Sequence, residues 1–165
     1  MAEISKNRIK VELNGQPLEG EVEPRQLLVE WIRNVAGLTG THIGCDTSYC
    51  GACTVLMDDE PVKSCTVLAV RADGTRVRTV EGLAQDGTPS PLQQAFSQHH
   101  ALQCGYCTPG MLMAATALIE KGGEVNEACV RKALAGNVCR CTGYQNIVTA
   151  VLAAAPVCNR QRHEA

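Results

Sequence analysis

The sequence predicts an α+β protein in which a β-rich half precedes a helical half. Three observations carry this prediction. Apolar and polar residues alternate with a period of two near the N-terminus, as in a half-buried strand. A segment rich in glycine, proline and polar residues follows at 81–91 and is typical of a linker. Beyond it, helix-starting dipeptides and apolar residues at helical spacing recur.

The first half is expected to hold a hairpin, a helix and three further short strands. Apolar residues alternate from Ile9 to Leu13, and Asn14-Gly15 is a strong hairpin signal, so a second strand should follow it. The period then becomes helical, and Gly37 stands where a C-terminal cap belongs. The apolar stripe of that helix consists of Leu27, Leu28, Trp31, Ile32 and Val35. The further strands are expected over 54–57, 65–71 and 76–80.

Four helices are expected in the second half. Ser90-Pro91 places a capping serine before a proline at the first helical position, and Thr108-Pro109 repeats that signature. Asn126 is the expected cap of a third helix. The fourth helix should stop at the next proline, which leaves a polar and loose tail.

The composition excludes several classes of protein. The chain has 165 residues, enough for one medium domain or two small ones, and a formal net charge of −2. This charge gives no reason to expect a nucleic acid or a membrane surface as a partner. No stretch approaches the ~20 apolar residues of a membrane span. The N-terminus has neither a signal peptide's apolar region nor a twin arginine, so a cytoplasmic location is expected. In that reducing compartment, ten cysteines favour zinc or iron–sulfur clusters over disulfides.

Four cysteines of the first half follow the spacing C-x4-C-x2-C, then eleven residues and a fourth cysteine. They are Cys45, Cys50, Cys53 and Cys65. This spacing is the plant-type [2Fe–2S] pattern. Gly44, Gly51 and Ala52 leave room for backbone N–H groups to turn toward sulfur, which would stabilise a negatively charged cluster. A four-cysteine zinc site is the alternative, although zinc sites favour two closely spaced pairs.

The second half holds a C-x2-C pair and, thirty-one residues later, a C-x-C pair. These cysteines are Cys104, Cys107, Cys139 and Cys141. A disulfide within the C-x-C pair would need a strained backbone, because an extended i, i+2 pair spans roughly 6.6–7.2 Å between Cα atoms. Two thiolates that grip one metal centre are the easier geometry, with the other pair completing the ligand set. Cys107 also precedes a predicted helix start, where the helix dipole would stabilise a thiolate. Taken alone, this quartet could also bind zinc.

Two cysteines remain outside the quartets. Cys129 lies at helical spacing from Val125 and Ala133 and is expected to be a small core residue, and Cys158 is expected to be a thiol of the tail without a ligand role. The chain shows no dinucleotide-binding fingerprint, no Walker A motif and no nucleophile elbow. It is therefore expected to move electrons and not to transform a substrate.

The longest motifs resemble a known family. "GCDTSYCGACTV" with "KSC", "QCGYCTPG" and "GNVCRCTGYQNI" resemble the small iron–sulfur subunit of the molybdenum hydroxylases, the xanthine oxidase family, over about 6–155. "LTGTHIGCDTS" and "VKSCTVLAV" look closest to the small subunits of aerobic carbon monoxide dehydrogenase and of related heterotrimeric dehydrogenases for N-heterocycles. The resemblance implies a β-grasp, plant-type ferredoxin domain in 1–80, a linker in 81–91, a four-helix domain in 92–155 and a loose tail in 156–165.

The resemblance also implies cofactors and partners. Each quartet would hold one [2Fe–2S] cluster, a large subunit would carry a molybdenum–pterin cofactor with the substrate site, and a medium subunit would carry FAD. The assembly would be a dimer of heterotrimers in which this chain relays electrons from pterin to flavin. In the family the helical-domain cluster lies nearer the pterin, so Gln103 and Cys141, on its two loops, are expected to face that cofactor. The rival hypotheses are a free two-cluster carrier and a two-zinc interaction module.

Overall fold

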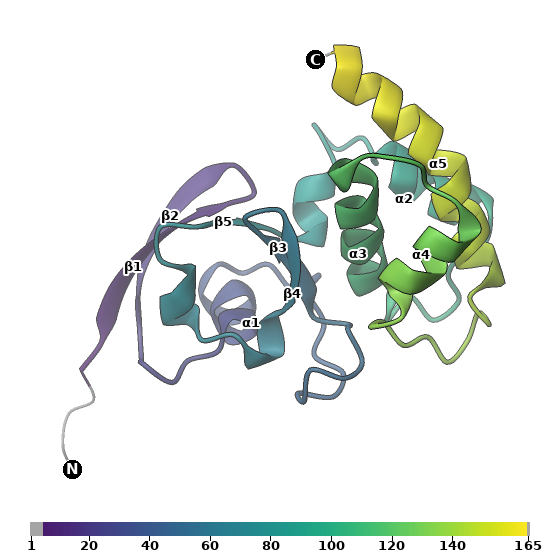
Figure 1. Ribbon diagram of the computed structural model, residues 1–165. Coiled ribbons are helices and arrows are strands. Elements are labelled where there is room, and N and C mark those ends of the chain that lie inside the picture. The colour runs from purple at the N-terminus through teal and green to yellow at the C-terminus, as the bar shows by residue number, and fades with distance from the viewer. Residues whose placement is uncertain (1–4, 165) are drawn as a thin grey trace.

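The computed structural model describes residues 5–164, with side chains described as far as 158, and shows two packed bodies (Figure 1). The first body is a mixed five-stranded sheet of order β2-β1-β5-β3-β4, in which β1 and β5 are parallel and the other neighbours antiparallel. Its strands are β1 (Asn7–Leu13), β2 (Gln16–Val22), β3 (Thr54–Met57), β4 (Glu60–Lys63) and β5 (Arg76–Arg78). The predicted α+β class, with a β-grasp body before a helical one, is confirmed.

Both hairpins of the sheet turn at residues with left-handed backbone. Asn14 (φ 51°) and Gly15 (φ 78°) join β1 to β2, as predicted, and Asp58 (φ 49°) and Asp59 (φ 67°) join β3 to β4. Two successive residues of positive φ form the type I′ turn, whose twist matches that of the flanking strands. The buried residues of β1 alternate along the strand, as the period of two predicted.

The helix predicted from the apolar stripe has an unusual second half. α1 (Leu28–Glu30) passes directly into a π-helical turn over Trp31–Val35, where the Ala36 amide donates to the Trp31 carbonyl at 3.0 Å. The wider turn changes the phase of the stripe. Trp31 is therefore fully buried against the sheet, whereas Val35, the last member of the predicted stripe, is 51% exposed.

The strand predicted over 65–71 is wrong. This segment forms two 3₁₀ turns, Ser64–Thr66 and Ala69–Ala72. Its backbone bonds to the start of α1, where the Leu28 amide donates to the Val67 carbonyl at 2.7 Å. The partner of β3 is β4, which comes earlier in the chain because the turn between them has only two residues.

The connection between the two bodies is ordered at its start. A 3₁₀ turn, Val80–Leu83, follows β5, and both of its end residues pack against the core of the helical body. The Glu81 carboxylate accepts from the Gly40 amide at 2.7 Å, and the Thr79 amide donates to the Asn14 side chain at 2.8 Å. The first part of the predicted linker is therefore fixed to the sheet by hydrogen bonds and to the helices by apolar contact.

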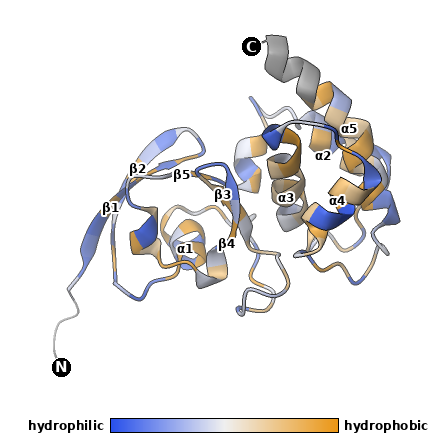
Figure 2. Cartoon of the chain, in the orientation of Figure 1, coloured by the Kyte–Doolittle hydropathy of each residue, from blue (hydrophilic) through white to orange (hydrophobic). Residues whose placement is uncertain are grey.

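Four α-helices form the second body: α2 (Pro91–Gln98), α3 (Thr108–Lys121), α4 (Glu127–Leu134) and α5 (Gln145–Glu164). α3 contacts β3 and β4 on one side and the other three helices on the other. Most of its residues are buried, and Figure 2 shows it as largely hydrophobic, as expected of a helix covered on all sides. Between residues 5 and 164, no helix is both long and apolar enough to cross a membrane.

The predicted helix cap at Ser90 is confirmed, and the one at Thr108 is wrong. Ser90 Oγ accepts from the Gln93 amide at 3.3 Å, and the Gln93 side chain accepts from the Ser90 amide at 2.8 Å, which makes a capping box. Thr108 already lies inside α3, and the residue before the helix is Cys107, whose side chain caps nothing. Asn126 caps α4 as expected.

The predicted stop of the last helix at Pro156 is wrong. α5 continues through this proline to Glu164. A proline inside a helix removes one backbone donor, but Pro156 is exposed, so the carbonyl that loses its partner can bond to water. Two residues beyond it, Cys158 packs against the core of the helical body and helps to hold the extension.

Candidate metal centres

The first quartet joins the loop before β3 to the turn after β4. Cys45, Cys50 and Cys53 lie on the loop, and Cys65 lies on the turn. Cys53 and Cys65 are 2% and 3% exposed, contact each other, and form a small apolar cluster with Val29. The fourth cysteine thus arrives from the far side of the β3–β4 hairpin, as the spacing predicted.

Left-handed residues wind this loop around sulfur. Asp46 and Ser48 have φ of 55° and 61°. The amides of Thr47 and Cys50 both donate to Cys45 Sγ, at 3.4 and 3.3 Å. Alternating backbone of this kind makes a concave nest of N–H groups that binds anions. The predicted inward turn of the backbone N–H groups is confirmed by these bonds.

The surroundings of Cys45 and Cys65, the first and last cysteines of the first quartet, shift the pKa values of their thiols in opposite directions. Hydrogen bonds from the Thr47 side chain and from the Cys50 amide lower the pKa of Cys45 to about 6. Burial raises the pKa of Cys65 to about 11. A thiolate at Cys65 therefore needs a bound cation at neutral pH, which is what ligation to iron supplies. Four sulfurs with N–H groups aimed at one of them fit a [2Fe–2S] cluster.

The second quartet joins the loop before α3 to the loop between α4 and α5. The Sγ atoms of Cys104 and Cys141 are 3.5 Å apart, and Cys107 contacts Cys139. Each pair takes one sulfur from each loop, so the two cysteines of the C-x-C motif have different partners. Two adjacent sulfur pairs suit two irons with two thiolates each. Among the residues described, no three His, Cys, Asp or Glu side chains are arranged to hold a single metal ion.

The inner pair of this quartet lies in mixed surroundings. Cys139 Sγ accepts from the Thr142 hydroxyl at 3.1 Å, whereas burial raises the pKa of Cys107 to about 12. Next to Cys107, Thr108 Oγ1 is buried and has no hydrogen-bond partner within the part of the chain that the structure describes. A buried hydroxyl without a partner is costly, and the sulfur of a bound cluster is an acceptor that would satisfy it. The second site therefore also fits an iron–sulfur cluster.

The outer pair of the second quartet reaches the surface. Cys104 and Cys141 are exposed, and so is Gln103 beside them. The Gln103 amide makes no hydrogen bond to any described residue, so its side chain does not brace the loop. This arrangement leaves Gln103 and Cys141 available to a partner, and their contact with a cofactor stays a prediction.

A direct hydrogen bond connects the two quartets. The Val138 amide, next to Cys139, donates to the Cys50 carbonyl at 2.8 Å. Beside this bond, the Asn137 amide donates to the Gly51 carbonyl at 2.9 Å and to Thr54 Oγ1 at 3.2 Å. Asn137 is 4% exposed. Cys50 of the first quartet and Cys139 of the second are thus joined through a short run of backbone and one hydrogen bond.

Two glycines allow the bodies to approach this closely. A Cβ on Gly51 would overlap the Gly136 carbonyl and lie 2.7 Å from the Asn137 amide nitrogen, and a Cβ on Gly110 would overlap the Gly51 carbonyl. The sequence assigned Gly51 to the approach of backbone to sulfur, and the structure gives it a further role in the approach of the two bodies. Gly44 fits that assignment better, because a Cβ there would lie 3.0 Å from Cys50 Sγ. We call Gly51, Lys63, Gly110, Gly136 and Asn137 the inner contact.

A second bridge between the quartets was missed by the sequence analysis. Tyr106, between Cys104 and Cys107, stacks on the ring of His42 with centroids 4.7 Å apart. Its hydroxyl donates to the Ile43 carbonyl at 2.7 Å. The sequence offered one signal for the role of Tyr106, its position between the two cysteines of the C-x2-C pair, because such a residue must lie at the surface of that loop. For Asn137, the adjacency to the C-x-C pair was the only signal.

The two remaining cysteines lie away from both quartets on the helices. The prediction that Cys129 is a core residue is wrong. Its side chain is half-exposed on α4 and lies outside the apolar core. Only Val125 of its predicted neighbours packs against that core. Cys158 lies half-buried on α5.

Comparison with known proteins defines the class that this fold and these sites represent. Residues 11–84 match the model of the 2Fe-2S iron-sulfur cluster binding domain, and residues 79–152 match that of the [2Fe-2S] binding domain. The protein is thus an iron–sulfur protein with two [2Fe–2S]-binding domains, and the prediction of two such clusters is confirmed.

The relatives narrow the class to a family. The chain is 53% identical to the nicotine 6-hydroxylase small subunit of Paenarthrobacter nicotinovorans, over 87% of each chain. It is 46% identical to the caffeine dehydrogenase subunit gamma of Pseudomonas sp. (strain CBB1), over 93% of each. The crystal structure of quinoline 2-oxidoreductase from Pseudomonas putida 86 superposes with a TM-score of 0.90 at 45% identity, covering 94% of this chain and 97% of that one. The chain belongs to the small iron–sulfur subunits of the molybdenum hydroxylase family, the electron-transfer components of multi-subunit dehydrogenases.

Proposed function

We propose that this chain relays single electrons from a molybdenum–pterin site in a large subunit to FAD in a medium subunit, within a dehydrogenase that oxidises an N-heterocycle. The observation that carries the proposal is the bond from the Val138 amide to the Cys50 carbonyl. It joins a loop that reaches the surface at Cys141 to a quartet on the other body. An electron that enters near Cys141 therefore has a direct route to the other body.

The eight quartet cysteines are the proposed ligands. Cys45, Cys50, Cys53 and Cys65 would hold one [2Fe–2S] cluster, and Cys104, Cys107, Cys139 and Cys141 would hold the other. Each cluster, when bound, accepts and releases one electron at a time. The chain supplies the thiolates, the N–H groups aimed at Cys45, and the contact that fixes the distance between the two sites.

The exposed ends of the two quartets support a direction for the relay. Gln103 and Cys141 would face the pterin, where the Gln103 amide can both donate and accept hydrogen bonds. On the other quartet, the loop residue Tyr49 is 77% exposed and would lie toward the flavin subunit. Electrons would therefore enter at the helical body and leave from the β-grasp body.

The names of the relatives support the rest of the proposal. Caffeine, nicotine and quinoline are all nitrogen heterocycles, and none of these relatives is named for carbon monoxide. The substrate would bind to another chain, since no candidate nucleophile or general base was found in this one. A dimer of heterotrimers in the cytoplasm is the proposed assembly.

Co-purification of the tagged chain from cells that express its neighbours tests the proposal. We expect about four irons and about four acid-labile sulfides per chain, as two [2Fe–2S] clusters require, together with molybdenum and FAD in associated subunits. Zinc in a colourless preparation would favour the two-zinc module. Full iron without any molybdenum or flavin subunit would favour the free carrier.

Gln103→Ala tests the entry point, with Gln98→Ala as the control because Gln98 is an exposed glutamine at the end of α2. Gln103→Ala should slow reduction of both clusters by substrate about tenfold in rapid-freeze EPR, a loss of about 1.4 kcal/mol in transition-state stabilisation. The EPR spectrum of the first quartet should not change. Equal rates in the two variants would remove Gln103 from the pathway.

A further inference from the structure

Lys63 occupies the centre of the inner contact. It is the last residue of β4 and precedes Cys65 by two positions. Its ammonium donates to the Gly136 carbonyl at 2.8 Å, and to Thr54 Oγ1 and Asn137 Oδ1 at 3.2 Å each. The three N–H groups of a lysine are thus all used, and two of the three acceptors belong to the helical body.

These three acceptors are neutral oxygens, so the charge of Lys63 is not compensated by them. Within the described residues, the lysine forms no ion pair with a carboxylate. Its side chain is half-buried, where an ammonium loses part of its hydration and an opposite charge is worth more than in water. A positive charge held in this way needs a negative charge close by.

Lys63 lies beside the cysteines of the first quartet, because it pairs across the β3–β4 hairpin with Thr54, the residue after Cys53, and stands two positions before Cys65. Burial lowers the pKa of Lys63, and attraction to the four sulfurs acts against that effect. The sulfurs that contribute are those of Cys53, Cys50, Cys65 and Cys45. The largest attractions on Lys63 thus all come from the first quartet, although the lysine also touches the residue two positions before Cys139. The field of the ammonium therefore acts mainly on one of the two sites.

A [2Fe–2S] cluster held by four thiolates is an anion that gains one more negative charge on reduction. A fixed cation nearby stabilises the reduced form more than the oxidised form, because Coulomb attraction grows with the charge. We propose that the Lys63 ammonium raises the reduction potential of the cluster held by the first quartet, selectively over the other cluster. One electron then moves more favourably from the second site to the first: iron at the second is oxidised and iron at the first is reduced. This consequence for direction rests on the proposed function, whereas the shift in potential does not.

The test is an EPR-monitored redox titration of the purified complex, with Lys63→Met as the charge-free variant and Lys63→Arg as the charge-retaining one. Lys63→Met should lower the reduction equilibrium constant of the first-quartet cluster about tenfold, which is about 59 mV for one electron. The second cluster should shift clearly less, and Lys63→Arg should stay close to the wild type. If Lys63→Met fails to assemble, Lys63→Gln keeps an N–H donor for the Gly136 carbonyl and is titrated instead.

Lys10→Met is the matched control, because it removes the same charge from a lysine on β1 whose side chain is 68% exposed. It should leave both potentials unchanged. Unshifted potentials in Lys63→Met, or equal shifts of the two clusters, would overturn the proposal. An equal shift in Lys63→Arg would overturn it as well, by showing that geometry and not charge sets the potential. A correct shift with electrons that flow in the opposite order would leave this inference standing and contradict the proposed function alone.

Discussion

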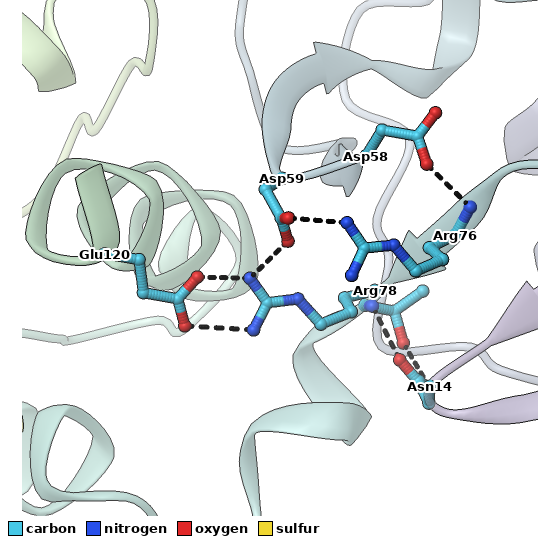
Figure 3. A network of polar contacts seen from close by, with 7 residues as sticks. Asn14, Asp58, Asp59, Arg76, Arg78 and Glu120 are labelled. Atoms are coloured by element: carbon cyan, nitrogen blue, oxygen red, sulfur yellow. Dashed lines mark hydrogen bonds and ion pairs between the residues drawn. The ribbon is translucent and has the colours of Figure 1, made fainter. Parts of the chain in front are cut away.

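Two of the contacts between the two bodies of the molecule differ in chemistry. The inner contact beside the quartets consists mainly of backbone carbonyls and glycines, with two polar side chains that bond across it, the buried amide of Asn137 and the half-buried ammonium of Lys63. The outer contact, shown in Figure 3, is made of long charged side chains: Arg78 of β5 pairs with Glu120 of α3 and with Asp59 of the β3–β4 turn. The side chains of this outer contact are between 30% and 56% exposed.

The difference shows where the distance between the bodies is fixed. Backbone groups and glycines have no side-chain freedom, so the inner contact tolerates little displacement. Exposed ion pairs contribute about 0–1 kcal/mol and adapt to small movements. Breaking a buried hydrogen bond and leaving its partner unsatisfied costs about 1–3 kcal/mol. The rigid contact is the one next to the hydrogen bond that joins the quartets.

The largest effect is expected for Gly51→Ala. Gly51 and Gly74 share a φ of +74°, but a Cβ on Gly51 would overlap the opposite backbone, while a Cβ on Gly74 meets nothing within 4 Å. Gly74→Ala should cost about 1 kcal/mol for its left-handed backbone alone. Gly51→Ala adds overpacking and should cost at least about 3 kcal/mol. Thermal unfolding measures both, and equal losses would show that the inner contact is not tightly packed.

A smaller but clear effect is expected for Asn137→Ala. The substitution removes an amide that bonds to Gly51, Thr54 and Lys63 across the contact. Its loss should cost about 2–3 kcal/mol, since buried partners are left unsatisfied. Asn146→Ala is the control, because Asn146 makes one exposed bond to the His100 carbonyl. Chemical denaturation gives both values, and a loss below about 1 kcal/mol for Asn137→Ala would contradict the account.

The smallest effect is expected for Arg78→Met in the outer contact. The loss should be about 1 kcal/mol or less at low salt and should shrink as ionic strength rises, because exposed charges are screened. The pairing with Glu120 raises the pKa of Arg78, so the guanidinium stays charged and the effect should not depend on pH near neutrality. Arg8→Met, which removes an exposed pair with Glu19 inside the sheet, is the control. A stability loss of about 3 kcal/mol in Arg78→Met that persists at high salt would show that the outer contact, and not the inner one, is the rigid contact.

The sequence predicts the sites better than their surroundings. Both cysteine quartets follow from spacing alone, because ligands of one centre must recur at fixed intervals along loops. The hairpin at Asn14-Gly15 and the cap at Ser90 follow from local backbone chemistry, which needs no knowledge of the rest of the chain.

What the sequence does not predict depends on contacts between distant residues. The segment with Cys65 has apolar residues suited to a strand, yet its amides and carbonyls bond to the start of α1. Pro156 is a helix breaker by propensity, and packing of α5 overrides it. Lys63 and Asn137 are ordinary polar residues in the sequence, and only the fold places them between the two cysteine quartets.

Rapid-freeze EPR of the assembled complex carrying Cys50→Ser, after addition of substrate, tests the central claim most directly. Cys50 belongs to the first quartet, and its carbonyl receives the bond from Val138. In Cys50→Ser we expect the helical-body cluster to be reduced at the normal rate while the flavin stays oxidised. Cys129→Ala, a cysteine outside both quartets, should behave as the wild type in both steps. A helical-body cluster that is structurally intact but no longer reduced in Cys50→Ser would show that electrons travel in the opposite order, and would contradict the account.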